Sequence, residues 1–346
     1  MSTLLARLRR CAASAPVLSP LVLSSLLLLT AVPAASLAAA AGKASAPAAD
    51  HHQHLFSPAI IALLAPAPGP DALRALPVEE LVGYLDAAGI RRAAVLSVAY
   101  MYGRPSRVVA DEYAKVKTEN DWTAAQAATY PERLRAFCGF NPLKDYALAE
   151  LERCAATPGL RHGIKLHFGN SDVQLENPAH LARLKEVFRA ANRHRMAIAV
   201  HMRASISLKR PYGEAQARAF LTQLMPLAPD IVVQVAHFAG AGPGYEDPPA
   251  NEVMRVFAEA AARKDPHTRT LYFDVASIAT PDIAPAQARE MVERIRMVGV
   301  DRILYGSDAA SPGNMKPREA WAAFRALPLT EAELERIANN VAPYLR

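Results

Sequence analysis

The heptapeptide AIAVHMR, residues 197–203, is a short apolar run that leads into an ionisable side chain. The same pattern recurs in VVQVAHF, residues 232–238, and in RILYGSD, residues 302–308. A continuous apolar run of this length is typical of a strand buried on both faces, as in a parallel sheet. The ionisable residues at the carboxyl ends of these runs are His201, His237 and Asp308.

Comparable runs recur along the chain after residue 50, and their starts lie about 29 to 41 residues apart. They are His52–Phe56, Ala93–Ala99, Leu134–Phe140, Gly163–Phe168, Met196–Met202, Ile231–Phe238, Leu271–Val275 and Arg302–Gly306. Segments with helical periodicity lie between them, most clearly Glu80–Ala88, Ala147–Ala156, Pro178–His194, Glu214–Leu227, Asn251–Ala262 and Pro285–Val298. Eight strand–helix units predict a single (β/α)8 TIM barrel over residues 50–346. An open doubly wound sheet is the alternative, but no G-x-G-x-x-G follows the first strand.

The composition is that of a globular protein with a sizeable core. The 346 residues are 51% hydrophobic and 21% charged and include 27 prolines, which together exclude a disordered chain, a coiled coil and a collagen-like fibre. Three cysteines are too few for a disulfide scaffold. The net charge of +6 falls to +3, from 36 basic and 33 acidic residues, without Arg7, Arg9 and Arg10. Because no basic run is interleaved with aromatic residues, we expect no nucleic-acid partner.

Residues 1–41 have the pattern of an export signal. The three arginines precede the apolar run Leu21–Val32, and small residues follow as far as Ala41. A basic start, a short apolar region and an A-x-A-like site are typical of a secretory signal peptide, so we expect an exported, periplasmic or secreted protein. The alternative is an uncleaved anchor, since residues 21–41 approach the roughly 20 residues that span a bilayer. Only then would the protein contact a membrane.

Two cysteines, Cys138 and Cys154, remain after the predicted signal. An oxidising compartment would allow them to pair. Each lies in an apolar segment, however, and no C-x-x-C is present. We therefore expect two buried free thiols.

The functional groups of a TIM barrel lie at the carboxyl ends of its strands. His52 and His54 are two residues apart on the first predicted strand, so their side chains share a direction, whereas His51 should point away from them. With His201, His237 and Asp308 they offer imidazole nitrogens and a carboxylate oxygen, which suit a divalent ion, Zn²⁺ before Mn²⁺. We predict a metal site there.

These residues resemble the amidohydrolase-related (amidohydrolase 2) family of the metal-dependent hydrolase superfamily. Asp50–Phe56 (DHHQHLF) is similar to the family's first-strand D-x-H-x-H motif, and Gly163–His167 (GIKLH) to its fourth-strand segment. Its fifth, sixth and eighth strand signatures resemble Val200-His201, Ala236-His237 and Tyr305–Asp308 (YGSD). The resemblance runs from Asp50 to the carboxyl end and implies a metal-bearing (β/α)8 barrel.

The resemblance also implies roles for individual residues. His52, His54 and His201 would be metal ligands, and Asp308 would be a ligand or the catalytic base. His237 would be a further ligand or an acid–base group. Lys165 and His167 share one face of the fourth strand: Lys165 could be carboxylated and bridge two metals, as in some superfamily members, or either residue could bind substrate. We expect one metal ion.

Such a site would support hydrolysis of an amide, ester or lactone of a small organic substrate, with Asp308 transferring protons and His237 or the metal stabilising negative charge. Some family members instead decarboxylate aromatic or unsaturated acids. Arg203 is placed to bind a carboxylate, although a salt bridge to a neighbouring loop would equally explain it. We favour the hydrolase. Asp274 on the seventh strand could support the site or cap a helix.

A third alternative is a non-catalytic exported protein that binds a metal or ligand. The presence of two groups that can transfer protons, Asp308 and His237, argues against it. The expected partner is a small-molecule substrate, and the sequence leaves a homo-oligomer open.

Overall fold

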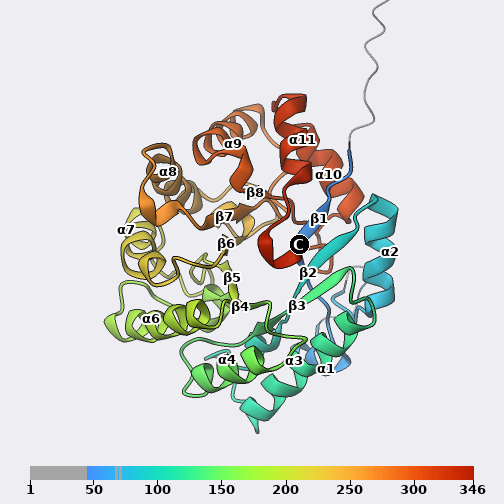
Figure 1. The fold of residues 1–346 in the computed structure, drawn as a ribbon, viewed down its shortest axis with the longest axis vertical. Helices are drawn as coiled ribbons and strands as arrows, with labels where there is room; N and C mark the ends of the chain where they lie inside the picture. Colours follow the sequence, from blue (N-terminus) through green and yellow to red (C-terminus); the bar gives the residue numbers. More distant parts are fainter. Residues whose placement is uncertain (1–44, 67–68, 70–71) are drawn as a thin grey trace, which may run out of the picture. The chain divides into compact units, whose positions relative to one another are not determined.

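The computed structural model describes residues 45–66, 69 and 72–346. Its sheet has eight parallel strands in the order β1 to β8, and helices surround them, as the alternating pattern predicts (Figure 1). The strands are β1 Ala49–Gln53, β2 Arg92–Leu96, β3 Leu134–Gly139, β4 Gly163–His167, β5 Ala197–His201, β6 Val233–Val235, β7 Leu271–Asp274 and β8 Ile303–Leu304. The predicted signal segment lies outside the described residues.

The two ends of the sheet meet at β1 and the segment that follows β8. The backbone N–H of His51 donates to the Tyr305 carbonyl over 2.8 Å, and that of Asp308 donates to the His52 carbonyl, also over 2.8 Å. Asp50 strengthens this seam, because its buried carboxylate accepts the Ser307 hydroxyl at 2.7 Å. Strand β1 begins at Ala49, three residues before the predicted start, so that the motif aspartate joins β1 to the chain after β8.

Strand β6 is shorter than its apolar run predicts. The chain turns out of the sheet at Ala236, and His237 and Phe238 both adopt left-handed backbone angles, with φ of 52° and 50°. Asp308 does the same after β8, with a φ of 51°. Left-handed residues cannot continue a strand, so each turn aims a polar side chain at the end of the barrel.

The helices of the outer layer include all six segments predicted from the sequence. Those of at least six residues are α1 Pro58–Leu64, α2 Val78–Ala88, α3 Glu112–Ala128, α4 Ala147–Ala156, α6 Pro178–Arg193, α7 Glu214–Ala219, α8 Pro248–Ala262, α9 Pro285–Val298, α10 Pro317–Arg325 and α11 Glu331–Asn339. The six segments do not include α1, α3, α10 or α11. In α3 the buried face carries Glu119, Asn120 and Thr123 among alanines, which weakens the apolar periodicity. Among the described helices, none is long and apolar enough to cross a membrane.

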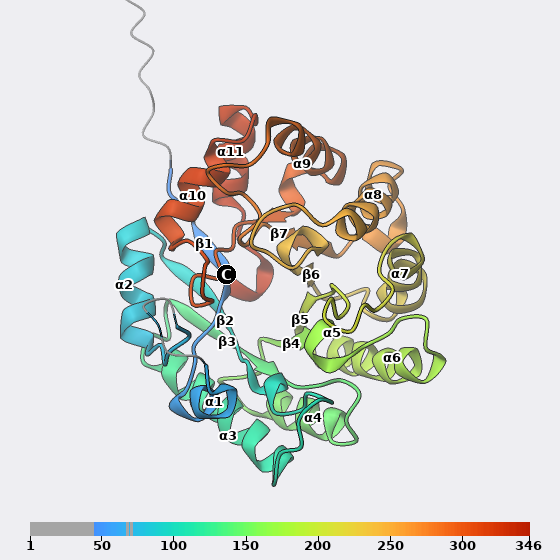
Figure 2. The same cartoon turned by 180° about the vertical axis from the view of Figure 1, so that it is seen from behind.

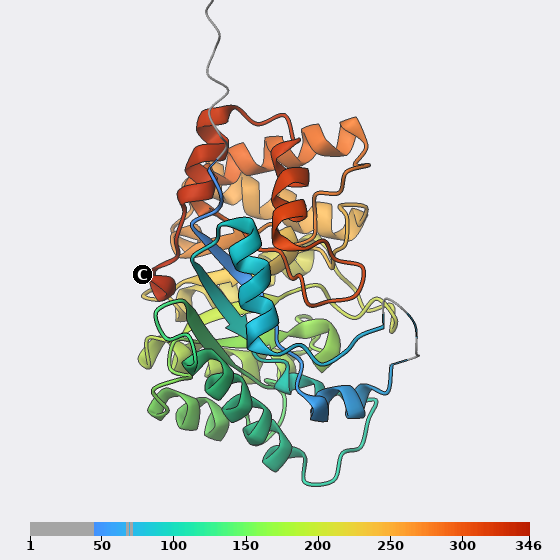
Figure 3. The same ribbon diagram turned by 90° about the vertical axis from the view of Figure 1, so that its right-hand side faces the viewer.

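The two ends of the barrel have different neighbours. Helix α1 lies at one end, and the carboxyl-terminal turn Pro343–Leu345 lies at the other (Figure 3). The end near α1, seen in Figure 2, carries the segments that follow the strands. Of the eight predicted site residues, His54, Arg203, His237 and Asp308 belong to those segments, and the other four lie within strands.

The expectation of two free thiols is wrong, because Cys138 and Cys154 form a disulfide. Helix α4 packs against β3, and this places the two α-carbons 6.2 Å apart, within the range that a disulfide bridges. The residues around each cysteine in the sequence did not indicate that the two side chains would be neighbours.

Loss of this disulfide should lower stability. It closes a loop of 16 residues, and cross-linking a loop of that size stabilises a protein by about 3 kcal/mol at 25 °C. We expect the double variant Cys138→Ala/Cys154→Ala to lose about 2–4 kcal/mol of unfolding free energy in urea titrations. Equal unfolding midpoints for the wild type with and without reductant would contradict the pairing.

A buried carboxyl on α3 should make stability depend on pH. The Glu119 side chain is 2% exposed, and Ser57 Oγ donates to its Oε2 over 2.5 Å. Burial raises the pKa of Glu119 to about 7. A carboxyl whose pKa is higher in the folded state binds its proton more tightly there, so its contribution to stability declines as pH rises from about 4.5 to about 7.

Replacing this carboxyl by an amide should remove that pH dependence. Relative to the wild type, Glu119→Gln should gain roughly 1–3 kcal/mol of unfolding free energy between pH 5 and pH 8. Urea titrations of both proteins at the two pH values measure the gain. A stability difference that does not change with pH would show that the group ionises normally.

Candidate active site

A cavity of about 270 Å³ lies at the end of the barrel where the strands finish. Seven of the eight predicted site residues line it: His52, His54, Lys165, His167, His201, His237 and Asp308. Its remaining wall is partly apolar, with Phe56, Val98, Tyr100 and Met101 on one side. The tertiary structure thus gathers residues that are up to 256 positions apart in the chain, from His52 to Asp308.

His52 and His54 each have one ring nitrogen bound to a group that can only accept. His52 Nδ1 lies 3.0 Å from Asp274 Oδ2, and His54 Nδ1 lies 2.5 Å from the Leu96 carbonyl oxygen. Both Nδ1 atoms must therefore carry hydrogen. In the neutral rings, each Nε2 is then left with a lone pair. Burial, followed by the charge of Lys165, lowers the pKa of His54 well below its usual value, which keeps that ring neutral.

The two Nε2 atoms lie only 3.2 Å apart. Two nitrogen lone pairs at this distance repel each other unless a cation lies between or beside them. Asp308 Oδ1 is 3.7 Å from His54 Nε2, and one atom each of His52, His54 and Asp308 lies within 4.8 Å of the others. Two imidazoles and a carboxylate so arranged fit a divalent metal ion.

Asp274 holds the first histidine in place. Its carboxylate is fully buried and accepts hydrogen bonds from His52 Nδ1, from Gln234 Nε2 at 2.6 Å and from the backbone N–H groups of His237 and Ala276. Burial alone would raise the pKa of Asp274, but the neighbouring His52 and these hydrogen bonds bring it below its usual value. A carboxylate that fixes the tautomer of a ligating histidine is typical of metal sites. Asp274 therefore supports the site.

His237 faces the cavity from the left-handed turn after β6. Its Nδ1 lies 2.9 Å from the Ala276 carbonyl oxygen, which leaves Nε2 without hydrogen in the neutral ring. The ring centroid is 4.7 Å from that of His52 and 5.1 Å from that of His201. Burial lowers the pKa of His237 to about 4. It can accept a proton or bind a metal.

His167 and His201 stack at the ends of β4 and β5, with ring centroids 3.9 Å apart. The backbone N–H of Asn170 donates to His167 Nδ1 over 3.2 Å, so the neutral ring of His167 carries its hydrogen on Nε2. Burial lowers the pKa of both histidines well below the usual value. His167 thus differs from His52, His54 and His237 and can donate a hydrogen bond to an oxygen in the cavity.

Lys165 points into the barrel from β4. It is 1% exposed, and its Nζ lies 3.2 Å from His52 Nε2. Burial lowers the pKa of Lys165 to about 8. Its amine therefore lies among the candidate metal ligands rather than at the mouth of the cavity.

The Asp308 carboxylate is held by two neighbours that the sequence reading did not identify. Ser311 Oγ donates to Oδ1 and Asn314 Nδ2 donates to Oδ2, each over 2.9 Å. The segment after β8 passes close to β1 at Gly306. A β-carbon at residue 306 would lie only 2.9 Å from His52 Cβ, so a glycine allows this close approach. The only sequence signal for Ser311 and Asn314 is their place in the loop after β8, on the functional face of a barrel.

Arg203 is the one predicted site residue that does not line the cavity. Its guanidinium binds Asp247 in the loop after β6, with Nε 2.6 Å from Oδ2 and a terminal nitrogen 3.2 Å from Oδ1. The guanidinium also lies over the Tyr212 ring. The structure therefore places Arg203 in a salt bridge to a neighbouring loop.

His51 points away from the cavity, as its parity predicts. Its Nδ1 lies 2.9 Å from the Tyr305 carbonyl oxygen, and its Nε2 accepts the backbone N–H of Ala342 over 3.1 Å. Its role is to join β1 to the carboxyl-terminal segment.

The fold and the site define a metal-dependent hydrolase-type barrel, and comparison with known proteins agrees. A family model described as Amidohydrolase matches residues 49–342. The chain therefore belongs to the amidohydrolase-related family of the metal-dependent hydrolase superfamily and is an enzyme. No curated protein matches the chain significantly.

Solved structures share the fold at low sequence identity. A 5-carboxyvanillate decarboxylase from Sphingomonas paucimobilis is 15% identical with a TM-score of 0.61, over 85% of this chain and 97% of that one. A dihydroxybenzoic acid decarboxylase from Polaromonas with bound manganese is 16% identical with a TM-score of 0.58, over 85% and 95%. A probable 2-pyrone-4,6-dicarboxylic acid hydrolase from Acinetobacter baumannii is 18% identical with a TM-score of 0.52, over 84% and 96%.

Proposed function

We propose that this enzyme is a metal-dependent hydrolase that cleaves an amide, ester or lactone bond of a small organic substrate. The observation that carries the proposal is Asp308: its carboxylate lines the cavity beside His54 Nε2 and accepts hydrogen bonds on both oxygens. A carboxylate held as an acceptor suits a base that takes a proton and then delivers it to a leaving group. Hydrolysis needs both transfers.

His52, His54 and Asp308 would hold one divalent ion, Zn²⁺ or Mn²⁺. His201 lines the same cavity but lies outside that cluster of ligand atoms, and in our proposal it would be the fourth ligand. A bound ion of this kind lowers the pKa of water and polarises a carbonyl oxygen. The chain's own residues then divide the remaining work. Asp308 moves the proton, the Nε2–H of His167 binds a substrate oxygen, and His237 accepts or returns a proton. The apolar wall at Phe56 and Tyr100 excludes water from the substrate.

Decarboxylation of an aromatic or unsaturated acid is the second candidate. Two of the similar structures described above are decarboxylases of aromatic acids, and one of these binds manganese. Lys165 is the only lysine or arginine that lines the described cavity, so apart from a bound metal ion it is the only cation among the described lining residues for the carboxylate of such a substrate. Its amine contacts His52 and Arg203 is engaged by Asp247, which is why we rank this reaction second.

Export remains part of the proposal. The disulfide between Cys138 and Cys154 supports it, because disulfides persist in oxidising compartments. The predicted signal within residues 1–41 would direct the chain there.

Metal content and product analysis test the function. Protein purified without chelator or nickel should contain about one divalent ion per chain, and His52→Ala should lose it. About two ions per chain would place a second metal at Lys165. No metal after reconstitution would contradict the proposed enzyme and favour a protein that only binds a ligand.

The metal-loaded enzyme should then be given two sets of compounds. Esters and lactones should yield acid and alcohol groups, and aromatic acids should yield no CO₂. Release of CO₂ from an aromatic acid, without hydrolysis of any ester or lactone, would contradict the hydrolase proposal and support the decarboxylase.

A further inference from the structure

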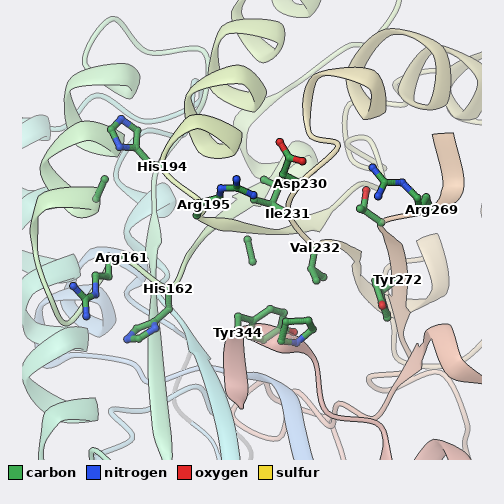
Figure 4. A pocket seen from close by; sticks show the side chains of 14 residues that line it. Arg161, His162, His194, Arg195, Asp230, Ile231, Val232, Arg269, Tyr272 and Tyr344 are labelled. Atoms are coloured by element: carbon green, nitrogen blue, oxygen red, sulfur yellow. The ribbon is translucent and has the colours of Figure 1, made fainter. Parts of the chain in front are cut away.

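A second cavity, of about 630 Å³, lies at the opposite end of the barrel from the active site. Figure 4 shows the side chains that line it. Its lining comes from the segments that precede β4, β5, β6 and β7 and from the carboxyl-terminal turn. The active-site residues come from the strands and from the segments that follow them, and the two cavities share no lining residue, so they are separate. A volume of this size suits a small-molecule ligand.

Three arginines line this cavity, each from a different loop. Arg161 precedes β4, Arg195 precedes β5 and Arg269 precedes β7. Within the described part of the chain, Arg161 and Arg195 have no carboxylate within 4.0 Å, and Arg269 Nη2 donates to the Pro229 carbonyl. Asp230, which accepts a hydrogen bond from Asn192, is the only acidic residue among those that line the cavity. The three guanidinium groups lie on different sides of the cavity (Figure 4), and their positive charges favour anions within it.

Neutral donors complete the lining. Thr270, Tyr272 and His162 belong to it. The Thr270 hydroxyl donates to the Ala228 carbonyl over 3.3 Å. Burial, followed by the charges of Arg135 and Arg161, lowers the pKa of His162 to about 4, so this ring is neutral at pH 7. Guanidinium groups with hydroxyl and imidazole donors are the groups that bind phosphate and carboxylate oxygens.

One wall of the cavity is connected to the metal site through the barrel core. Tyr344 lines the cavity and its hydroxyl donates to Gln234 Oε1. Gln234 Nε2 donates to Asp274 Oδ2 over 2.6 Å, and the same oxygen binds His52 Nδ1. Because Asp274 can only accept, it fixes the orientation of the Gln234 amide. The chain Tyr344–Gln234–Asp274–His52 therefore spans the barrel.

We propose that this second cavity is a regulatory site for a small anion with at least two negative charges, and that the chain from Tyr344 to His52 couples it to metal binding. A bound anion would fix the position of the Tyr344 side chain and so strengthen the hydrogen bonds from Tyr344 to Gln234 and from Gln234 to Asp274. His52 would then be oriented more firmly, and the metal would bind more tightly. The coupling rests on the proposed metal site, whereas anion binding does not.

Anion binding is measured by titration calorimetry on the full-length, metal-free protein at low ionic strength. Pyrophosphate and citrate serve as probes, and the tighter of the two identifies phosphate or carboxylate as the preferred group. Arg195→Gln and Arg269→Gln should each weaken binding about tenfold. Arg193→Gln is the matched control, because this exposed arginine pairs with Glu152 outside the cavity, and it should leave binding unchanged. No binding of either anion at millimolar concentration, or binding insensitive to both cavity variants, would overturn the proposal.

Coupling is measured as the affinity for Zn²⁺ in competition with a chelator, with and without sulfate. Sulfate itself binds zinc weakly, and it is added at a concentration at which the same calorimetry shows it bound to the metal-free protein. We expect sulfate to tighten zinc binding about fivefold in the wild type. Tyr344→Phe lacks the hydroxyl that bonds Gln234, so it should abolish this effect while it still binds the anion. An unchanged zinc affinity in the wild type, or the same fivefold effect in Tyr344→Phe, would overturn the coupling and leave the metal site itself intact.

Discussion

Asp308→Asn should lower kcat/KM by about 10³-fold, the size expected for loss of a group that transfers protons. The amide is nearly the same size and can still offer an oxygen to a metal ion, but it cannot accept a proton. In the proposed metal site His52, His54 and His201 would remain to bind the ion, so most of the metal should stay bound. The measurement is kcat/KM on the substrate found by the product screen, together with metal content by elemental analysis.

The variant Ser311→Ala is a control that tests how much the position of the Asp308 carboxylate matters. It removes one hydrogen bond to Asp308 and keeps the carboxylate, so a loss of about tenfold or less is expected. An Asp308→Asn enzyme that retained activity within tenfold of the wild type, with its metal, would show that Asp308 is not the base.

Asp274→Ala should cost about 3–5 kcal/mol of unfolding free energy. The substitution removes a fully buried carboxylate and leaves four donors without their acceptor: His52 Nδ1, Gln234 Nε2 and the N–H groups of His237 and Ala276. Loss of the group that orients a ligating histidine also weakens metal binding by about 10- to 100-fold. Urea titration of the metal-free protein and chelator competition measure the two effects separately.

Asp282→Ala is the matched control for this loss. Asp282 is an exposed aspartate eight residues further along the chain, in the loop after β7, so its removal should change stability by less than about 0.5 kcal/mol. If Asp274→Ala were as stable as this control and bound metal normally, the carboxylate would have no part in holding His52.

Asp308→Asn and Asp274→Ala test residues with different places in the same site. Asp308 lines the cavity, whereas Asp274 is buried behind His52 and shares Gln234 with the chain that leads to Tyr344. Asp274→Ala should therefore also abolish any effect of the second cavity on the metal, whereas Asp308→Asn leaves the chain from Tyr344 to His52 unchanged.

Periodicity and strand-end polarity were enough to predict the barrel, and together with the family resemblance they selected eight residues, of which seven line one cavity. Strands of a parallel barrel are buried on both faces, so they read as apolar runs, and the residue at each carboxyl end faces a shared cavity. His52, His201 and Asp308 could be assigned in this way because each is identified by its own position along a strand. Helix α3 was not predicted, because polar residues on its buried face weaken the apolar periodicity.

Contacts between distant segments could be read only from the tertiary structure. Arg203 follows β5 as a substrate-binding residue would, yet it pairs with Asp247, 44 positions away. Cys138 and Cys154 lie in separate apolar segments, and only the packing of α4 on β3 makes them partners. The tautomers of His52 and His167 depend on Asp274 and on one backbone N–H of the next loop. Local order along the chain determines which elements form, but pairings across the barrel depend on how those elements pack.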